Sequence, residues 1–455
     1  MILTDLLVFQ NISIREALAK IDANRSGFVL LMDKKNAVVA LATDGDIRRR
    51  LIDGGSMDDV ILDCANEDFV WFDSQTPREL LLKKLDEKIK FIPLLDINRN
   101  LTGIVGNQHF PVQIEEQVYV RSRAPVRVSF GGGGSDLNHY LLGDSGAVIN
   151  ATLAIYSHAT LRLRDDMRII VNSTDLNGTL IAENLKEFLE LDGDFGLIQA
   201  LLKTVQPNFG FELYLSSDFP MKSGLGGSAA ISAVVLGCFN HLRRDKWDSY
   251  ELAELAFQAE RVFLGVEGGW QDQYATVFGG VNFMEFQIEK NVIHPLRVPN
   301  NIMFELEENL VLCDTGIIHE SGNIHNDQKK EMLTNRVREQ IKENVRLTYR
   351  IRDQLLRGEL TEFGQSLDKA WSLKKSFSKK ISSKHLDGIY EGALAHGAVG
   401  GKLLGAGGGG FFLFYVDTFR KQELIAFLQS KDLHVRPLNF EDHGLRTWSF
   451  RVNNK

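Results

Sequence analysis

One glycine-rich segment constrains the fold of this chain more than any other. Residues 218–230 read Asp-Phe-Pro-Met-Lys-Ser-Gly-Leu-Gly-Gly-Ser-Ala-Ala and run directly into the apolar segment Ile231 to Phe239. A glycine turn that opens a helix leaves backbone N–H groups at the helix N-terminus, where aligned amides and the helix dipole hold phosphate. The glycines also permit the close backbone approach that a polyphosphate needs. The segment therefore predicts a phosphate-binding loop, with a tight-packing turn as the alternative.

This loop differs from a Walker A sequence, because no lysine follows Gly227. Ser228 follows instead, and it places a hydroxyl where a metal ion bound to a nucleotide would sit. If the loop binds phosphate, the chain belongs to another class of phosphotransferase.

Length and charge limit what else the chain can be. A chain of 455 residues is too long for one ordinary hydrophobic core, so we expect two or three domains. The net charge of −8 argues against nucleic acid or an anionic membrane as the main partner. The cysteines are scattered and odd in number, which is typical of a reducing compartment. No apolar run reaches the roughly 20 residues that span a bilayer, and we expect a cytoplasmic protein.

The first hundred residues contain an internal repeat. Segments 12–47 and 76–106 each read as a helix, a strand that ends in Asp, a turn and another strand. Short repeats of this kind cannot bury an apolar face alone, so we expect the two copies to pack against each other. The repeat resembles a tandem CBS domain pair, a module that binds adenine nucleotides or tightens dimers.

The resemblance assigns a regulatory adenine nucleotide to the first copy. That copy carries the family's Thr-x-x-Asp ending as Thr43 and Asp46, which would meet ribose and phosphate groups. The second copy, at 106–109, has no such Thr or Asp. A structural or dimerising pair without a ligand is an equal alternative.

The rest of the chain mixes strand-like and helical segments, which indicates an α+β or α/β kinase-like domain after a linker at 113–117. A helix is predicted at 249–264, with Asp248 as N-cap and Glu251 completing a capping box. Apolar spacing predicts a second helix at about 329–357.

Three glycine-rich elements punctuate this larger domain, at 123–136, 218–230 and 400–411. The first and third each contain four consecutive glycines, which cost backbone entropy in a folded chain. Both runs lie within strand-like apolar sequence, which excludes a flexible linker. We therefore expect the backbone at these elements to approach a ligand closely.

In this order and at these separations, the three elements resemble motifs one, two and three of the GHMP small-molecule kinases. The resemblance covers essentially all of residues 120–455. Within that superfamily, segments 130–136, 268–280 and 401–410 are most similar to the D-glycero-D-manno-heptose 7-phosphate kinases. Those enzymes phosphorylate the anomeric hydroxyl of a heptose phosphate for nucleotide-sugar synthesis.

The resemblance also implies the architecture. The fold class is α+β, with a ribosomal protein S5 domain 2-like subdomain at 116–300 and a ferredoxin-like subdomain at 301–455. The CBS pair would occupy 1–115. Such a pair is not part of the usual pattern of these kinases, so any regulation would be peculiar to this branch.

Two residues are implied to be catalytic. Asp272 falls on the superfamily's catalytic acidic residue, where a carboxylate can accept or orient the proton of a sugar hydroxyl. Arg127 occupies the position of a basic residue in motif one, where it could hold Asp272 ionised and stabilise the moving phosphoryl group. The alternatives are a turn-capping Asp and a structural Arg–carboxylate pair.

A metal pair, a nucleotide loop and a sugar site follow from the same resemblance. Ser228 and Glu260 would ligate Mg²⁺, unless Glu260 forms a buried ion pair. Asp136 matches the acidic position that binds sugar hydroxyls, and an Asx-turn after the four glycines is the alternative. ATP would contact Lys222, Ser223, Gly224, Leu225, Gly226, Gly227, Ser228 and Ala229. The sugar would contact Gly133, Gly134, Ser135, Asp136, Gly408 and Gly409.

The chain also departs from the family. Gly227 stands where many relatives carry serine, and Trp270 stands where heptose phosphate kinases are expected to carry lysine. If that lysine holds the substrate phosphate, this chain prefers another or an unphosphorylated sugar. The basic run at 374–384 is either a replacement phosphate grip or a solvated helix face.

The predicted function is that of an ATP- and Mg²⁺-dependent kinase for a sugar or sugar phosphate, with a regulatory CBS pair. One alternative is a nucleotide-sensing regulator whose kinase domain is vestigial. Another is a GHMP kinase for a different small metabolite. A homodimer is a further hypothesis, because CBS pairs often associate.

Overall fold

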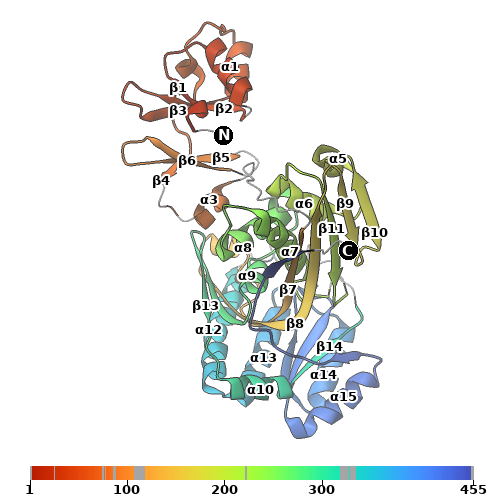
Figure 1. Cartoon of the computed structure of the whole chain (residues 1–455). Coiled ribbons are helices and arrows are strands. Elements are labelled where there is room, and N and C mark those ends of the chain that lie inside the picture. The colour runs from red at the N-terminus through yellow and green to blue at the C-terminus, as the bar shows by residue number, and fades with distance from the viewer. Residues whose placement is uncertain are drawn as a thin grey trace. The chain divides into compact units, whose positions relative to one another are not determined.

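The computed structural model of the chain (Figure 1) describes residues 3–24, 26–73, 76, 78–85, 89–106, 118–220, 223–317, 327, 331 and 335–451. It divides into two compact units, Met1–His109 and Phe110–Lys455. The predicted linker at 113–117 and Lys222 lie outside the described residues. In the part of the chain that the structure describes, no helix is both long and apolar enough to cross a membrane.

The first unit contains the predicted repeat as two small sheets, ordered β1-β2-β3 and β4-β5-β6. In each sheet the first pair of strands is parallel and the second antiparallel. The first copy comprises η1 (Leu3–Leu6), β1 (Leu7–Phe9), α1 (Ile14–Asn24), β2 (Phe28–Met32), β3 (Val38–Thr43), α2 (Asp44–Ile52) and η2 (Ile61–Cys64). The second comprises β4 (Phe72–Asp73), α3 (Arg78–Lys84), β5 (Phe91–Leu95) and β6 (Leu101–Gly106).

The turn after the central strand is the same in both copies. Asp33 and Asp96 each accept two backbone N–H bonds through Oδ1, from the residues two and four positions later. Asn36 and Arg99 take the left-handed conformation at the end of these turns, with φ of 65° and 62°. Between the two sheets, the rings of Phe28 and Phe91 stack with centroids 3.5 Å apart. The expected packing of one copy against the other is therefore observed.

The second unit is built on an eight-stranded sheet. Its path runs β10-β9-β11-β8-β12-β13, and β7 pairs with β8 on one side and β18 on the other. The strands are β7 (Val118–Gly131), β8 (Gly146–Leu163), β9 (Ile169–Ser173), β10 (Gly178–Ala182), β11 (Phe211–Ser217), β12 (Val281–Phe286), β13 (Asn291–Pro295) and β18 (Arg446–Arg451).

Helices cover this sheet on both faces. The apolar helix α7 packs along β7 and β8, with α8 and α9 against it (Figure 1). The long α12 contacts β7 and β8, and α13 packs on α12. The helices between the strands of this sheet are α4 (Asn138–Leu141), α5 (Leu185–Glu190), α6 (Gly196–Val205), α7 (Gly227–Leu242), α8 (Ser249–Gln258), the π-helical turn η3 (Ala259–Phe263) and α9 (Gln271–Phe278).

A smaller antiparallel sheet, ordered β15-β16-β14-β17, completes the unit. When the three described helices between β14 and β15 are taken as one connection, the chain order is β-α-β-β-α-β, the order of the predicted ferredoxin-like arrangement. Its elements are α10 (Asn300–Asn309), β14 (Leu310–Asp314), α12 (Asn335–Arg357), α13 (Leu360–Lys375), α14 (Lys384–Ala395), β15 (Ala398–Leu403), β16 (Phe411–Val416), η4 (Thr418–Arg420), α15 (Lys421–Gln429) and β17 (His434–Arg436).

The helix predictions are confirmed where the structure describes them. Asp248 caps α8 and forms a capping box with Glu251. The helix predicted at 249–264 continues beyond Gln258 as a single π-helical turn. Of the helix predicted at 329–357, residues 335–357 are helical, and Val337, Ile341, Thr348, Ile351 and Leu355 are buried on its apolar face.

Candidate active site

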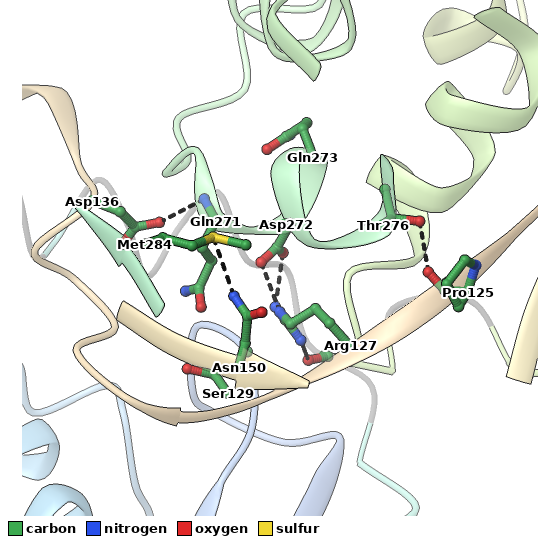
Figure 2. Close-up of polar contacts among 12 residues, drawn as sticks. Pro125, Arg127, Ser129, Asp136, Asn150, Gln271, Asp272, Gln273, Thr276 and Met284 are labelled. Atoms are coloured by element: carbon green, nitrogen blue, oxygen red, sulfur yellow. Dashed lines mark hydrogen bonds and ion pairs between the residues drawn. The ribbon is translucent and has the colours of Figure 1, made fainter. Parts of the chain in front are cut away.

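The centre of the site is an ion pair between β7 and the first turn of α9. Figure 2 shows the guanidinium of Arg127 facing both carboxylate oxygens of Asp272. Its Nε and Nη2 atoms each donate a 2.7 Å hydrogen bond to Asp272, and Nη1 donates a 2.8 Å bond to the carbonyl of Gly224. Arg127 is 3% exposed, whereas Asp272 is 28% exposed and open to a substrate. A bidentate pair of this kind fixes the carboxylate in one orientation.

The glycine-rich loop at 223–229 ends directly beside this pair. Gly226, with φ of 80°, precedes α7, and no side chain of the residues that the structure describes caps this end of the helix. A Cβ at Gly226 would lie 3.3 Å from Asp272 Oδ2, so the loop passes against the carboxylate. The first amides of α7 are therefore left for a ligand, and the helix dipole favours an anion there.

Gly227, the departure from many relatives, has a packing reason. A Cβ at this position would lie 2.5 Å from the ring of Phe219, which is itself buried. A serine here would need the ring to move. The buried ring of Phe219, which packs under the loop, thus occupies the space that a serine side chain at position 227 would need.

The third glycine-rich element packs on the second. A Cβ at Gly405 would lie 2.7 Å from the Cα of Gly224, and one at Gly410 would lie 2.4 Å from the carbonyl of Ser223. Both glycines also have positive φ, of 68° and 89°. Close approach of these two backbones is what requires glycine.

Gly408 and Gly409, which the sequence assigned to the sugar, pack against neighbouring backbone. The N–H of Gly408 donates to the carbonyl of Ile381, and a Cβ at Gly409 would lie 2.5 Å from that of Ile317.

Two buried lysines lie behind these loops. Lys374, at the end of α13, donates from Nζ to the carbonyls of Leu403 and Gly405. Burial, with Arg127 nearby, lowers the pKa of Lys374 to about 7. Lys402 on β15 is 3% exposed, and burial together with the charge of Lys374 lowers its pKa well below the ordinary value. Sequence reasoning noticed Lys374 only as part of a basic run and missed Lys402.

The carboxylate predicted to bind metal lies in the π-helical turn after α8. Burial raises the pKa of Glu260 to about 7, while the hydroxyl of Ser228 and the amide of Gln273 lower it. Gln273 donates to Oε2 at 3.2 Å, and Oε1 is buried and has no partner among the described residues that meets hydrogen-bond distance and angle limits. π-helical turns of this kind are frequent at functional sites.

These groups fit a magnesium ion that is held largely by phosphate. Ser228 and Glu260 bring a hydroxyl and a carboxylate together, which are the hard oxygen ligands that Mg²⁺ takes. Among the described residues no three His, Cys, Asp or Glu side chains gather as a metal site. Mg²⁺ commonly needs only one or two carboxylates, because the substrate phosphates and water complete its shell.

Asp136 forms a second acidic position next to the Arg127–Asp272 pair. It is 2% exposed and accepts hydrogen bonds from the backbone N–H of Gly134 and Gln271, at 3.1 and 3.2 Å. Burial raises its pKa to about 6, and the nearby charge of Asp272 adds to this. A Cβ at Gly269 would lie 1.9 Å from Asp136 Oδ2, so the loop before α9 needs glycine there.

The other predicted residues have structural surroundings. The Ser135 hydroxyl is buried and bonds to backbone groups of Gly132 and Ala147, so it shapes the loop. Trp270 is 7% exposed and stacks on Phe257 with ring centroids 4.4 Å apart, so its ring packs against α8.

The basic run does not form one solvated face. Lys374 is buried, Lys375 pairs with Asp387 at 3.2 Å, and Lys380 pairs with Asp327 at 3.5 Å.

The sequence matches a known family of kinases. The family models "GHMP kinases N terminal domain" and "GHMP kinases C terminal" match residues 195–280 and 351–432. The chain is 37% identical over 335 residues to the D-glycero-alpha-D-manno-heptose 7-phosphate kinase of Campylobacter jejuni, covering 72% of this chain and 98% of that protein.

Two solved structures have the same fold as this chain. A D-glycero-D-manno-heptose 1-phosphate kinase from Bacteriodes thetaiotaomicron is 29% identical, with a TM-score of 0.61, covering 73% of this chain and 100% of that one. The Lactococcus lactis galactokinase complexed with galactose is 18% identical, with a TM-score of 0.60, covering 72% of this chain and 95% of that one.

Proposed function

The chain belongs to the GHMP kinases and is a phosphotransferase with an alcohol acceptor, and we propose that it transfers the γ-phosphoryl group of ATP to the anomeric hydroxyl of a heptose 7-phosphate. The observation that carries this proposal is the bidentate Arg127–Asp272 pair directly beside the uncapped N-terminus of α7. The carboxylate of Asp272 can accept a proton from a hydroxyl, and the amides at the start of α7 can hold phosphate. Two of the three relatives named above are heptose phosphate kinases, which favours this acceptor over mevalonate or homoserine.

In the proposed reaction, the acceptor hydroxyl lies against the exposed edge of Asp272. Its oxygen attacks the γ-phosphorus, the bond from that phosphorus to the β–γ bridging oxygen breaks, and ADP leaves. The hydroxyl proton passes to Asp272. Arg127 holds the carboxylate in place and offsets the negative charge of the moving phosphoryl group, so positioning and charge stabilisation lower the barrier.

The amides of Gly227, Ser228 and Ala229 would hold the ATP phosphates at the start of α7. Ser228 and Glu260 would hold Mg²⁺, which supplies charge neutralisation for the triphosphate when bound. Glu260 carries a raised pKa in the absence of a cation, and a bound cation would favour its charged form. Asp136 would bind sugar hydroxyls, with the glycine loop 405–410 as support.

A substrate panel tests the proposal. ADP release would be measured with heptose 7-phosphate, heptose 1-phosphate, free heptose, galactose, homoserine and mevalonate. We expect the highest kcat/KM with heptose 7-phosphate and a product phosphorylated at the anomeric carbon. Trp270 packs on Phe257 and supplies no cation, so preference for an unphosphorylated sugar is the informative alternative result. Turnover of none of these would contradict the proposal and favour a vestigial kinase domain.

We further propose that the first unit is a CBS-type pair that binds an adenine nucleotide. A cavity of about 550 Å³ within this unit is lined by Thr43, Asp46, Arg49, Lys90 and Phe91, among others. Its size suits a small ligand, and it combines cations for phosphate with an aromatic side chain for a base. Thr43 and Asp46 form the capping box of α2, so their hydrogen bonds also hold the cavity wall.

Calorimetry on the full chain would test this with AMP, in the wild type and in Lys90→Ala. We expect two classes of adenine-nucleotide site for ATP, of which AMP occupies only the one that Lys90→Ala weakens. Absence of AMP binding would leave the unit a structural or dimerising pair. Sedimentation of the full chain against residues 116–455 would test the proposed homodimer.

A further inference from the structure

A buried asparagine on α12 contacts the first glycine loop through its side-chain nitrogen and has an unused acceptor oxygen. Asn344 is 3% exposed, and its Nδ2 donates a 3.3 Å hydrogen bond to the carbonyl of Gly133. That bond fixes the orientation of the carboxamide, because only the nitrogen can face a carbonyl oxygen. Oδ1 is buried and has no hydrogen-bond partner among the described residues. A buried acceptor without a partner costs free energy, so its presence calls for a ligand or another explanation.

A second carboxamide, that of Gln271 on α9, lies near the same glycine. The side-chain Nε2 of Gln271, at the start of α9, lies 3.7 Å from the Cβ position of Gly133. Oε1 of Gln271 is buried and has no partner among the described residues. In Figure 2 the Gln271 side chain lies between Asp136 and the Arg127–Asp272 pair. The backbone N–H of Gln271 bonds to Asp136, which fixes this end of α9.

Gly133 itself has no packing reason to be glycine. Its φ is not in the left-handed region, and a Cβ there would meet only Gln271 Nε2 within 4 Å among the described residues. Gly132, by contrast, has a φ of 83°, and a Cβ there would lie 1.9 Å from the Ala147 carbonyl. Among the described residues, the space over Gly133 is thus open beside the Gln271 carboxamide, and the Asn344 carboxamide contacts the carbonyl of the same glycine.

We propose that the carboxamides of Gln271 and Asn344, with the open backbone at Gly133 between them, bind hydroxyls of the sugar ring away from the reacting one. This inference rests on the proposed function, since it describes how the same acceptor is recognised. A carboxamide both donates and accepts, so it pairs with a hydroxyl in either direction. Asp136 takes a neighbouring hydroxyl, and Asp272 takes the reacting one. A site that hydrogen-bonds a hydroxyl rejects an analogue that lacks it.

A double-mutant-type cycle, in which a side chain of the enzyme and a hydroxyl of the substrate are removed singly and together, tests this subsite. Heptose 7-phosphate and its monodeoxy analogues would be assayed with wild type, Asn344→Ala, Gln271→Ala and Gly133→Ala. We expect Asn344→Ala and Gln271→Ala each to lower kcat/KM by about 3- to 10-fold, mainly through KM, as loss of one neutral hydrogen bond predicts. For one deoxy analogue per variant, the two penalties should not add, because both deletions remove the same bond. Gly133→Ala should keep the wild-type melting temperature and raise KM for the sugar alone.

Gln354→Ala is the matched control. Gln354 lies on the same helix, is 8% exposed and also has a buried Oε1 without a partner, but it lies more than two turns beyond Asn344. We expect it to change stability without changing KM. The inference is wrong if the Asn344→Ala and Gln271→Ala penalties add with every analogue, or if Gln354→Ala alters KM to the same degree. If the wild type turns over no sugar, the proposed function fails and this inference fails with it.

Discussion

Replacing Asp272 by Asn tests the centre of the site. In the folded protein, Arg127 gives two of its three hydrogen bonds to this carboxylate, and only 3% of its side chain is exposed. An asparagine keeps one acceptor and turns an N–H group toward the guanidinium, so one bond is lost and a buried cation has no counterion. Breaking a buried pair costs about 3–5 kcal/mol, and the 28% exposure of Asp272 reduces this to about 2–3 kcal/mol.

The effect on the reaction should be larger than the effect on stability. Proton transfer by a positioned group contributes about 10²–10⁴-fold, and the carboxylate also orients the hydroxyl. We expect kcat/KM for the sugar to fall by at least about 10³-fold, equivalent to about 4 kcal/mol of transition-state stabilisation. The amides proposed to bind ATP belong to α7, so the Kd for MgATP should stay within about 3-fold of the wild type, a difference under 1 kcal/mol.

The assay combines coupled ADP release, calorimetry with MgATP and thermal melting. Glu212→Gln is the matched control, because Glu212 is 29% exposed, pairs with Arg162 and lies on β11. Its stability change should be at most about 1 kcal/mol and its turnover unchanged. Turnover of Asp272→Asn within about 10-fold of the wild type, in a folded sample, would refute the assignment of Asp272 as proton acceptor.

Three further predictions follow from buried groups around this pair. The pKa of Glu260 is raised from 4.5 to about 7, so the folded protein keeps a proton that the unfolded chain has lost. Without ligands, stability should therefore fall by about 3 kcal/mol as pH rises from about 4.5 to 7, and Glu260→Gln should flatten that slope in denaturant titrations. Gly269→Ala places a Cβ 1.9 Å from Asp136 Oδ2. This substitution should destabilise the protein by about 1–3 kcal/mol, which thermal melting would measure. It should also weaken binding of the sugar more than binding of MgATP, which the two KM values would show. The pKa of Lys374 is lowered from 10.5 to about 7, so stability should rise with pH across that window. Lys374→Met should remove this rise and, by loosening the loop at 404–410, raise KM for ATP; an unchanged pH slope would contradict the burial of a titrating amine.

The local elements of the site were predictable because their signals are local. The glycines before α7, the capping box at Asp248 and Glu251, and the strand at Arg127 all follow from neighbouring residues. The resemblance to GHMP kinases added Asp272, and the structure brings it to Arg127 across 145 positions.

Other features depend on contacts that no local pattern encodes. Trp270 reads as a changed substrate contact in sequence, yet its ring stacks on Phe257. Gly227 reads as a lost hydroxyl, yet the ring of Phe219 occupies the space that a side chain would need. Lys402 lies in a strand among apolar residues, and its pKa is lowered only because it is buried beside Lys374 and Arg127. In each case the neighbour that decides the outcome belongs to another element.

The sequence by itself determined the repeat, the three glycine-rich elements and the helix that follows the second of them, since turn chemistry and periodicity act over a few residues. The tertiary structure decided which side chains lie around the Arg127–Asp272 pair. Asn344 meets Gly133 across 211 positions, and its unused oxygen becomes informative only after burial removes water as a partner. Long-range packing sets that burial, and a pattern within one helix cannot reveal it.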